Sequence, residues 1–364
     1  MADTQTGSSA PGASQPQEAA TTNTPPANVP DHEVVVEADD DGDDSSSNLG
    51  TRSVASSTTS VTNSIFDYRV ENGRTYHKHK EGKYKYPNDE KENERLDLQH
   101  NLFLLTFNDQ LGTAPINTNG SSVGRVLDVG TGTGIWAIDF GEEHPEAEVL
   151  GIDLSPIQPG FTPPNVYFEI DDLDESWEYS KPFDYIHMRM LNSCIGDWKE
   201  FAKKSYDNLT PGGYLELNDM DLVPISDDGT LKPDSKIVKA VTLLQQALVT
   251  TGRQFETASN LKNVLIEAGF TDVTYQQFKW PLNPWPKDRR HKELGLWNNQ
   301  NLNDALEAVY MAAYTRILGW TKEEVLVFMA EVRKEVNDTS IHAYMPIWSI
   351  YGKKPEQADA TEDQ

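Results

Sequence analysis

The stretch RVLDVGTGTGIW, residues 125–136, places three glycines at alternate positions directly behind a short segment with the pattern of a buried strand. Glycine lacks a Cβ atom, so it permits unusual backbone angles and lets a ligand lie directly against the main chain. In open α/β sheets, ligands bind at the carboxyl edge, where such a turn stands. We therefore predict that Gly130, Gly132 and Gly134 form a ligand-binding turn from strand into helix. The alternative is a turn that only packs the helix closely on the strand.

The segments that follow this turn alternate between strand-like and helical patterns. Such alternation predicts a mainly parallel sheet with crossover helices. Asn88-Asp89 predicts the cap of a helix ahead of the sheet, and Thr321 with Glu324 forms a capping box that predicts the start of the last helix. The expected strands are 125–129, 147–153, 166–171, 183–190, 212–219, 272–280 and 343–352, and the expected helices are 90–107, 135–146, 198–208, 235–252, 257–270 and a helical insert over about 291–337.

Composition divides the chain into a tail and a folded part. Residues 1–64 are rich in Ser, Thr, Ala, Pro and Gly and contain the acidic run EADDDGDDSSS. Such a segment cannot bury enough apolar surface to offset its conformational entropy, so we expect a disordered tail. The remaining sequence predicts a helical N-terminal cap over 65–120 and an α/β domain over 121–355 with a helical insert over about 285–337. A polar tail over 356–364 follows.

The charge and the cysteine usage limit the class of protein. The chain carries a formal net charge of −27, whereas a nucleic-acid-binding protein needs a basic surface. Cys194 is the only cysteine, which suits a reducing compartment. Neither a secretory signal nor an apolar run of membrane-spanning length is present in the sequence. We expect a cytoplasmic or nuclear protein that is not secreted and binds neither nucleic acid nor membrane directly.

Acidic residues stand at the ends of the first three expected strands. Asp128 precedes the glycines, where a carboxylate suits an ammonium group and would repel a pyrophosphate. Asp153 closes the second strand, where a carboxylate can accept hydrogen bonds from both ribose hydroxyls. Asp172 follows the third strand and can accept from an adenine amino group, with Leu173 beside the ring, and Asp171 is the alternative if the register shifts by one. Ammonium, ribose and adenine together indicate S-adenosylmethionine.

Two alternatives to this cofactor site follow from the same residues. A dinucleotide site has the spacing G-x-G-x-x-G, whereas this loop has G-x-G-x-G and an acid directly before it. The glycine spacing and the third acid therefore argue against NAD. Each aspartate taken singly is also typical of a helix cap, so the prediction depends on the three acids occurring together.

The sequence resembles the class I methyltransferases, and more narrowly the fungal LaeA-like group, also labelled the trans-aconitate methyltransferase type. The resemblance rests on the stretch VLDVGTGTGIWAIDFGEEHPEAEVLGIDLSPIQP, on NVYFEIDDLDESW and FDYIHMRML, and on the flanking motifs YPNDEKENERLDLQH and IHAYMPIWSIYGKKP. It implies a Rossmann-like seven-stranded sheet with helices on both faces and an antiparallel last strand, and a link to fungal secondary metabolism or its regulation. The predicted cofactor-binding residues are Asp128, Gly130, Thr131, Gly132, Gly134, Asp153, Leu154, Asp171, Asp172 and Leu173.

The sequence assigns no catalytic residue. Methyl transfer from a sulfonium depends mainly on holding the nucleophile in line with the methyl group, and a general base is needed only for a poorly ionised acceptor. His187, at the end of the fourth strand, is a candidate base or a buried core histidine. Arg189 is a candidate clamp for an acceptor carboxylate, a contact to the cofactor or a salt-bridge partner. Asn218 and Asp219, at the end of the fifth strand, are further candidates.

The sequence does not identify the methyl acceptor or any protein partner. We expect a small-molecule or protein methyl acceptor, and the acidic tail together with the resemblance suggests a regulatory protein partner in a nuclear complex. Tyr76 and Tyr84 are either lid residues or part of a solvated segment. His77 and His79 alternate with lysines and lack a nearby cysteine, so we predict no metal site. Four aromatic residues of the expected insert either form the wall of an apolar pocket or belong to the core: Trp297, Tyr310, Tyr314 and Trp320. Near the C-terminus, His342 and Tyr344 belong to the resemblance, but it assigns them no role.

Overall fold

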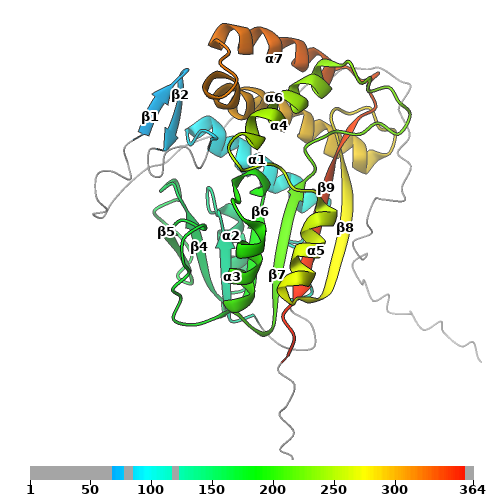
Figure 1. The fold of residues 1–364 in the computed structure, drawn as a ribbon. Helices are drawn as coiled ribbons and strands as arrows, with labels where there is room; N and C mark the ends of the chain where they lie inside the picture. The colour runs from blue at the N-terminus through cyan, green and yellow to red at the C-terminus, as the bar shows by residue number, and fades with distance from the viewer. Residues whose placement is uncertain (1–67, 78–84, 117–122, 357–364) are drawn as a thin grey trace, which may run out of the picture.

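The computed structural model describes residues 68–77, 85–116 and 123–356 (Figure 1). The expectations for the two tails, and for Tyr84 and His79, lie outside the described residues. The main sheet has seven strands in the order β5-β4-β3-β6-β7-β9-β8. These strands are β3 (Arg125–Val129), β4 (Glu148–Asp153), β5 (Val166–Ile170), β6 (Phe183–Arg189), β7 (Leu209–Met220), β8 (Thr271–Pro281) and β9 (Tyr344–Lys353).

Strand direction and register confirm the predicted α/β fold. β3, β4, β5, β6 and β7 pair in parallel, whereas β9 runs antiparallel to both β7 and β8. Parallel neighbours need crossover connections, and helices supply them here. The loops that follow β3, β4, β5 and β6 therefore meet at one edge of the sheet, where the candidate site residues lie.

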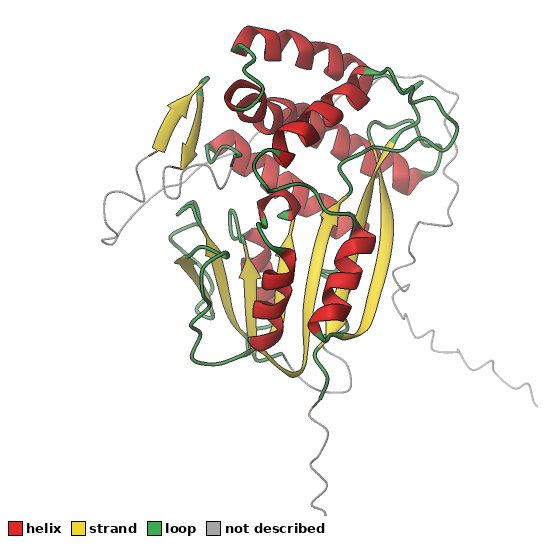
Figure 2. Ribbon diagram, viewed as in Figure 1, coloured by secondary structure: helices red, strands yellow, loops and turns green. Residues whose placement is uncertain are grey.

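Helices cover both faces of the sheet (Figure 2). α3 (Trp198–Asp207) and α5 (Ala258–Ala268) pack on the face that carries Leu127, and α2 (Ile135–Glu143) packs on the face that carries Val126. Successive strand residues point to opposite faces, so these two neighbours enter different hydrophobic cores. The buried residues of α2 are Trp136, Ala137, Phe140 and Gly141, and the helix ends before Pro145, as the sequence predicts.

A layer of longer helices lies over the carboxyl edge of the parallel strands (Figure 1). It contains α1 (Glu90–Thr106), α4 (Lys236–Val249), α6 (Arg289–Arg316) and α7 (Lys322–Val336). Its core includes Phe103, Leu244 and Met329 and extends onto Trp280 of β8 and Ile347 of β9. Asp89 caps α1, and the predicted capping box of Thr321 and Glu324 begins α7. None of the helices in the described ranges combines the length and apolar character that a membrane crossing requires.

The N-terminal extension contains a β-hairpin that the sequence analysis did not predict. β1 (Tyr68–Glu71) pairs antiparallel with β2 (Arg74–His77). The turn residues Asn72 and Gly73 have φ angles of 54° and 88°, which is typical of a tight hairpin turn. Arg74 donates to both carboxylate oxygens of Asp89, at 2.5 and 2.7 Å, so the hairpin is fixed to the first turn of α1. In the described part of residues 65–120, the predicted helical cap therefore contains a hairpin followed by one helix.

Candidate functional site

The glycine turn joins β3 to α2 with three left-handed residues, Gly130, Gly132 and Gly134. A Cβ atom at Gly130 would stand 2.3 Å from Cδ1 of Leu191, so neighbouring side chains exclude any larger residue there. At Gly132, with φ of 58°, the nearest atom to an added Cβ is Cδ1 of Leu96, 3.6 Å away. The main chain at Gly132 therefore faces space that a ligand can occupy.

Asp128, at the end of β3, is held in a buried network. Thr131 Oγ1 donates to its Oδ2 at 2.6 Å and His187 Nδ1 donates to its Oδ1 at 2.8 Å. The His187 ring also stacks on Trp136, with ring centroids 3.7 Å apart, and is 1% exposed. Its Nε2 has no hydrogen-bond partner among the described residues. These contacts fix the position of the Asp128 carboxylate beside the glycine turn.

Asp153, at the end of β4, lies against the same turn. Gly132 N–H donates to Asp153 Oδ2 and Ser155 N–H donates to Oδ1, both at 2.9 Å. Each carboxylate oxygen has more than one lone pair, so both oxygens can still accept hydrogen bonds from a ligand. Burial raises the pKa of Asp153 to about 6, and the charge of Asp128 adds to this shift.

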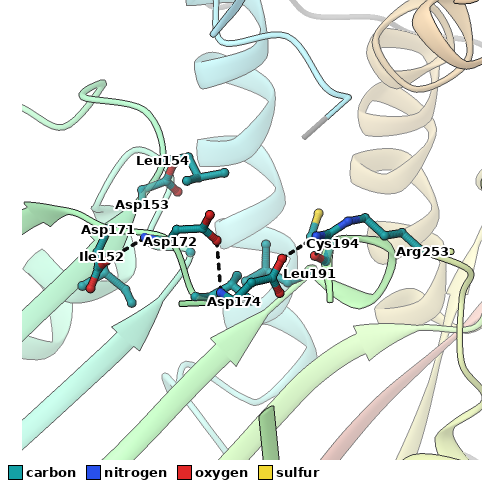
Figure 3. A pocket seen from close by; sticks show the side chains of 11 residues that line it. Ile152, Asp153, Leu154, Asp171, Asp172, Asp174, Leu191, Cys194 and Arg253 are labelled. Carbon is teal, nitrogen blue, oxygen red and sulfur yellow. Dashed lines mark hydrogen bonds and ion pairs between the residues drawn. The ribbon is translucent and has the colours of Figure 1, made fainter. Parts of the chain in front are cut away.

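A first cavity, here called the Asp172 cavity, encloses about 480 Å³ between the ends of β4, β5 and β6. Asp153 and Asp172 lie on one side of it, and Cys194 and Arg253 lie on the other (Figure 3). Asp172 is 3% exposed, and its Oδ1 accepts from Asp174 N–H at 3.1 Å. The predicted residues Leu154, Asp171 and Leu173 also line this cavity.

A second cavity, here called the glycine-loop cavity, encloses about 590 Å³ on the other side of the turn. It shares Gly130, Asp153 and Leu191 with the Asp172 cavity, so the two adjoin. Of the predicted cofactor-binding residues, only Gly134 lines neither. The remaining predicted residues around it are Asp128, Thr131, Gly132, His187 and Arg189.

Arg189 is a buried cation in the wall of the glycine-loop cavity. Its guanidinium donates to His100 Nδ1 at 3.0 Å and lies over the ring of Phe103. His100 in turn contacts Asp139 through Nε2 at 2.8 Å. Burial lowers the pKa of Arg189 to about 10, whereas Asp128 and Asp139 oppose the shift. The side chain therefore stays protonated near neutral pH and presents a positive charge to the cavity.

Helix α1 contributes site residues that the sequence analysis missed. Thr133 Oγ1, in the glycine turn, donates to Asp97 of α1 at 2.7 Å. Leu96 and Gln99 of the same helix line the glycine-loop cavity. The motif ENERLDLQH carries polar residues on several sides of α1, which indicates polar surroundings for part of this helix but does not select Leu96 or Gln99 as site residues.

Several other predicted positions lie apart from the two cavities. Tyr76 is buried in β2 beneath the guanidinium of Arg316. The carboxamide of Asn218 donates to the buried Glu216 at 3.1 Å. Among the four aromatic candidates, Tyr314 is in the core and Trp297 is 40% exposed. His342 and Tyr344 contact Asp228 and Asp227 at 2.6 and 2.9 Å.

Comparisons with known proteins place the chain among methyltransferases. Residues 99–275 match the family described as Methyltransferase domain. Methyltransferase pytC of Aspergillus terreus is 41% identical over 301 residues, which cover 82% of this chain and 92% of pytC. Secondary metabolism regulator LAE1 of Cochliobolus heterostrophus is 38% identical over 292 residues, covering 79% of this chain and 95% of LAE1. Secondary metabolism regulator laeA of Aspergillus fumigatus is 37% identical over 293 residues, covering 78% of this chain and 76% of laeA.

Proposed function

This chain belongs to the family of methyltransferases that includes pytC and the secondary metabolism regulators LAE1 and laeA, and we propose that it binds S-adenosylmethionine across the Asp172 cavity and the glycine-loop cavity. The chain is an S-adenosylmethionine-dependent methyltransferase. The observation that carries the proposed site is the free space beside Gly132, in a turn that lines one cavity together with the carboxylates of Asp128 and Asp153.

The residues around the two cavities suit the chemical groups of this cofactor. Asp153 would accept from the ribose hydroxyls, since both of its oxygens keep lone pairs. Asp172 would accept from the adenine amino group, with Leu173 beside the ring and Asp171 as the alternative. Asp128 would attract the ammonium group, and the charge of Arg189 in the same cavity would attract the carboxylate.

The bound cofactor supplies an electrophilic methyl group on a sulfonium. The protein residues orient the reactants and exclude water, which is the main requirement of an in-line displacement. His187 holds Asp128 through Nδ1, so we assign it a positioning role on the cofactor side. Asp219 and Met190 line a further cavity beneath the helical layer, where we place the methyl acceptor. Burial raises the pKa of Asp219 to about 7. A carboxylate with this pKa is suited to accept a proton from an acceptor hydroxyl near neutral pH.

Isothermal titration calorimetry with S-adenosylmethionine tests the cofactor site directly. We expect one binding site in the full chain, and an affinity at least tenfold lower in Asp153→Ala because the ribose loses its acceptor. Circular dichroism of the same sample shows whether the variant is folded. Folded wild-type protein that releases no heat with S-adenosylmethionine contradicts the proposal.

A second function, regulation through a protein partner, is favoured by the 37–38% identity to relatives named secondary metabolism regulators. In this case metabolite production would depend on binding of a protein partner more than on methyl transfer. A strain that lacks the gene would be complemented with wild-type protein or with Asp153→Ala. Equal restoration of metabolite production by both proteins supports regulation without methyl transfer, and restoration by wild-type alone supports the methyltransferase function.

A further inference from the structure

A third cavity lies beyond the cofactor crevice, beneath the helical layer. It lies between α1, α4, α6, α7 and the ends of β8 and β9, measures about 1,150 Å³ when the space open to solvent is included, and is here called the helix-lined cavity. Its wall is mostly aliphatic and includes Leu222, Val241, Leu244, Leu302, Leu306 and Val332.

The helix-lined cavity adjoins the glycine-loop cavity at a defined place. Leu96, Gln99 and Met190 line both of them. Leu96 and Gln99 come from α1, and Met190 directly follows β6. These three residues therefore mark the place where a molecule in the helix-lined cavity comes next to the crevice that we assign to the cofactor.

Most polar groups in the helix-lined cavity are already paired. Arg95 donates to Glu92 at 2.7 Å and to Asn301 at 2.8 Å. Asn298 donates to the carbonyl of Pro281 at 2.9 Å. By contrast, Gln99 is a buried residue (6% exposed) that lines both cavities, and its carboxamide makes no hydrogen bond with any residue that the structure describes. A buried amide favours a hydrogen-bond partner, and this one lies where the two cavities meet.

From this arrangement we infer that the methyl acceptor is a mainly apolar small molecule, which lies in the helix-lined cavity with its methyl-accepting polar group beside Gln99. Aliphatic walls favour burial of an apolar body, and the unpaired amide favours one polar end. A lysine or arginine side chain of a protein acceptor would bring a second cation beside Arg95. Of the two carboxylates along the cavity, Glu92 is already bound by Arg95, and Asp219 accepts from the main-chain N–H groups of Asn192 and Met220. This inference rests on the proposed cofactor site.

The first experiment measures binding of the neutral apolar dye Nile red to the full chain, with S-adenosylhomocysteine present to fill the cofactor crevice. We expect saturable binding to one site. Ala305→Trp places an indole in the cavity and should weaken dye binding at least tenfold. Val309→Trp, at a partly exposed position on the same wall, gives a second test if Ala305→Trp does not fold. Val327→Trp, at a position of α7 that is 66% exposed, is the matched control and should bind like wild type.

The second experiment follows radiolabel from S-[methyl-14C]adenosylmethionine in a fungal extract. We expect label in compounds that an organic solvent extracts, and loss of this label with Ala305→Trp. Label only in precipitated protein overturns the inference, and so does dye binding that is absent in wild type or unchanged in both folded cavity variants. Calorimetry with S-adenosylmethionine separates the two proposals. If the wild type does not bind this cofactor, the proposed function fails, whereas cofactor binding without dye binding refutes the acceptor inference alone.

Discussion

Gly130 and Gly132 have similar backbone angles but different surroundings. An alanine at either position adopts a left-handed conformation that costs roughly 1–2 kcal/mol. At Gly130 its methyl group also clashes with Leu191, whereas at Gly132 its nearest neighbour is Cδ1 of Leu96 at an ordinary contact distance. We therefore predict that Gly132→Ala lowers the free energy of unfolding by about 1–2 kcal/mol and the S-adenosylmethionine affinity at least tenfold. Gly130→Ala should destabilise the protein more. Urea denaturation and calorimetry measure the two effects, and an unchanged affinity in folded Gly132→Ala would contradict the assigned role.

Asp153 should make cofactor binding dependent on pH. Burial raises its pKa to about 6 in the folded protein, and the ribose hydroxyls donate best to the ionised carboxylate. Affinity should therefore be full above pH 7 and decline as the pH falls through 6. At pH 5 about one carboxyl in ten is ionised, which predicts an affinity about tenfold lower than at pH 7. Calorimetry at several pH values measures this, with Asp153→Asn as a control whose weak affinity should change little.

At the scale of elements, the hydrogen bond from Thr133 to Asp97 joins the glycine turn to α1. Thr133→Val removes the donor and leaves the half-buried Asp97 carboxylate with one partner fewer, which costs about 0.5–1.5 kcal/mol. We also expect three- to tenfold weaker binding of S-adenosylmethionine, because α1 forms one wall of the crevice. Thr321→Ala in the capping box of α7 is the control. It should lower stability by about 1 kcal/mol without changing the affinity, and equal affinity losses in both variants would show a general effect of stability.

Local patterns predicted most elements but omitted one. The seven strands and the caps at Asp89 and Thr321 were predicted correctly because strand alternation and capping depend on neighbouring residues. The hairpin at Tyr68–His77 was missed although its signal is equally local. Asn72-Gly73 between two short polar strands favours a hairpin turn, but the strands lack a clear apolar alternation because their packing partners lie on other elements.

Some site residues could be predicted from the sequence, and others depend on how the helices pack. Asp128, Asp153 and Asp172 could be selected from the sequence because each ends a strand and strand ends converge in a parallel sheet. Gln99 could not be, because its position at the meeting point of two cavities depends on how α1 packs against α6. Helical spacing likewise could not separate Tyr310, which lines the helix-lined cavity, from Tyr314, which is in the core.

At the scale of the whole molecule, the helical layer and the sheet are joined because some strands and helices contribute residues to both. β8 and β9 belong to the sheet along their length, but Trp280 and Ile347 enter the core of the helical layer. α1 contributes to that core through Phe103 and borders the cofactor crevice through Leu96. A ligand in the cofactor crevice would therefore contact both the sheet and the helical layer. The methyl acceptor in the helix-lined cavity would also contact both of them.

This shared structure predicts that cofactor binding stabilises both layers together. A ligand that binds only the native state adds about 2.7 kcal/mol at a concentration one hundred times its dissociation constant. S-adenosylhomocysteine at that concentration should raise a single melting temperature, with the same midpoint by far-ultraviolet circular dichroism and by tryptophan fluorescence. Trp280 lies in the helical core and Trp136 in the core under α2, so the part of the wild-type fluorescence change that is lost in Trp280→Phe reports on the first core, and the part lost in Trp136→Phe reports on the second. Two separate unfolding transitions, of which S-adenosylhomocysteine shifted only one, would show that the two layers unfold independently. Cofactor binding in the crevice would then not stabilise the helical layer that surrounds the helix-lined cavity.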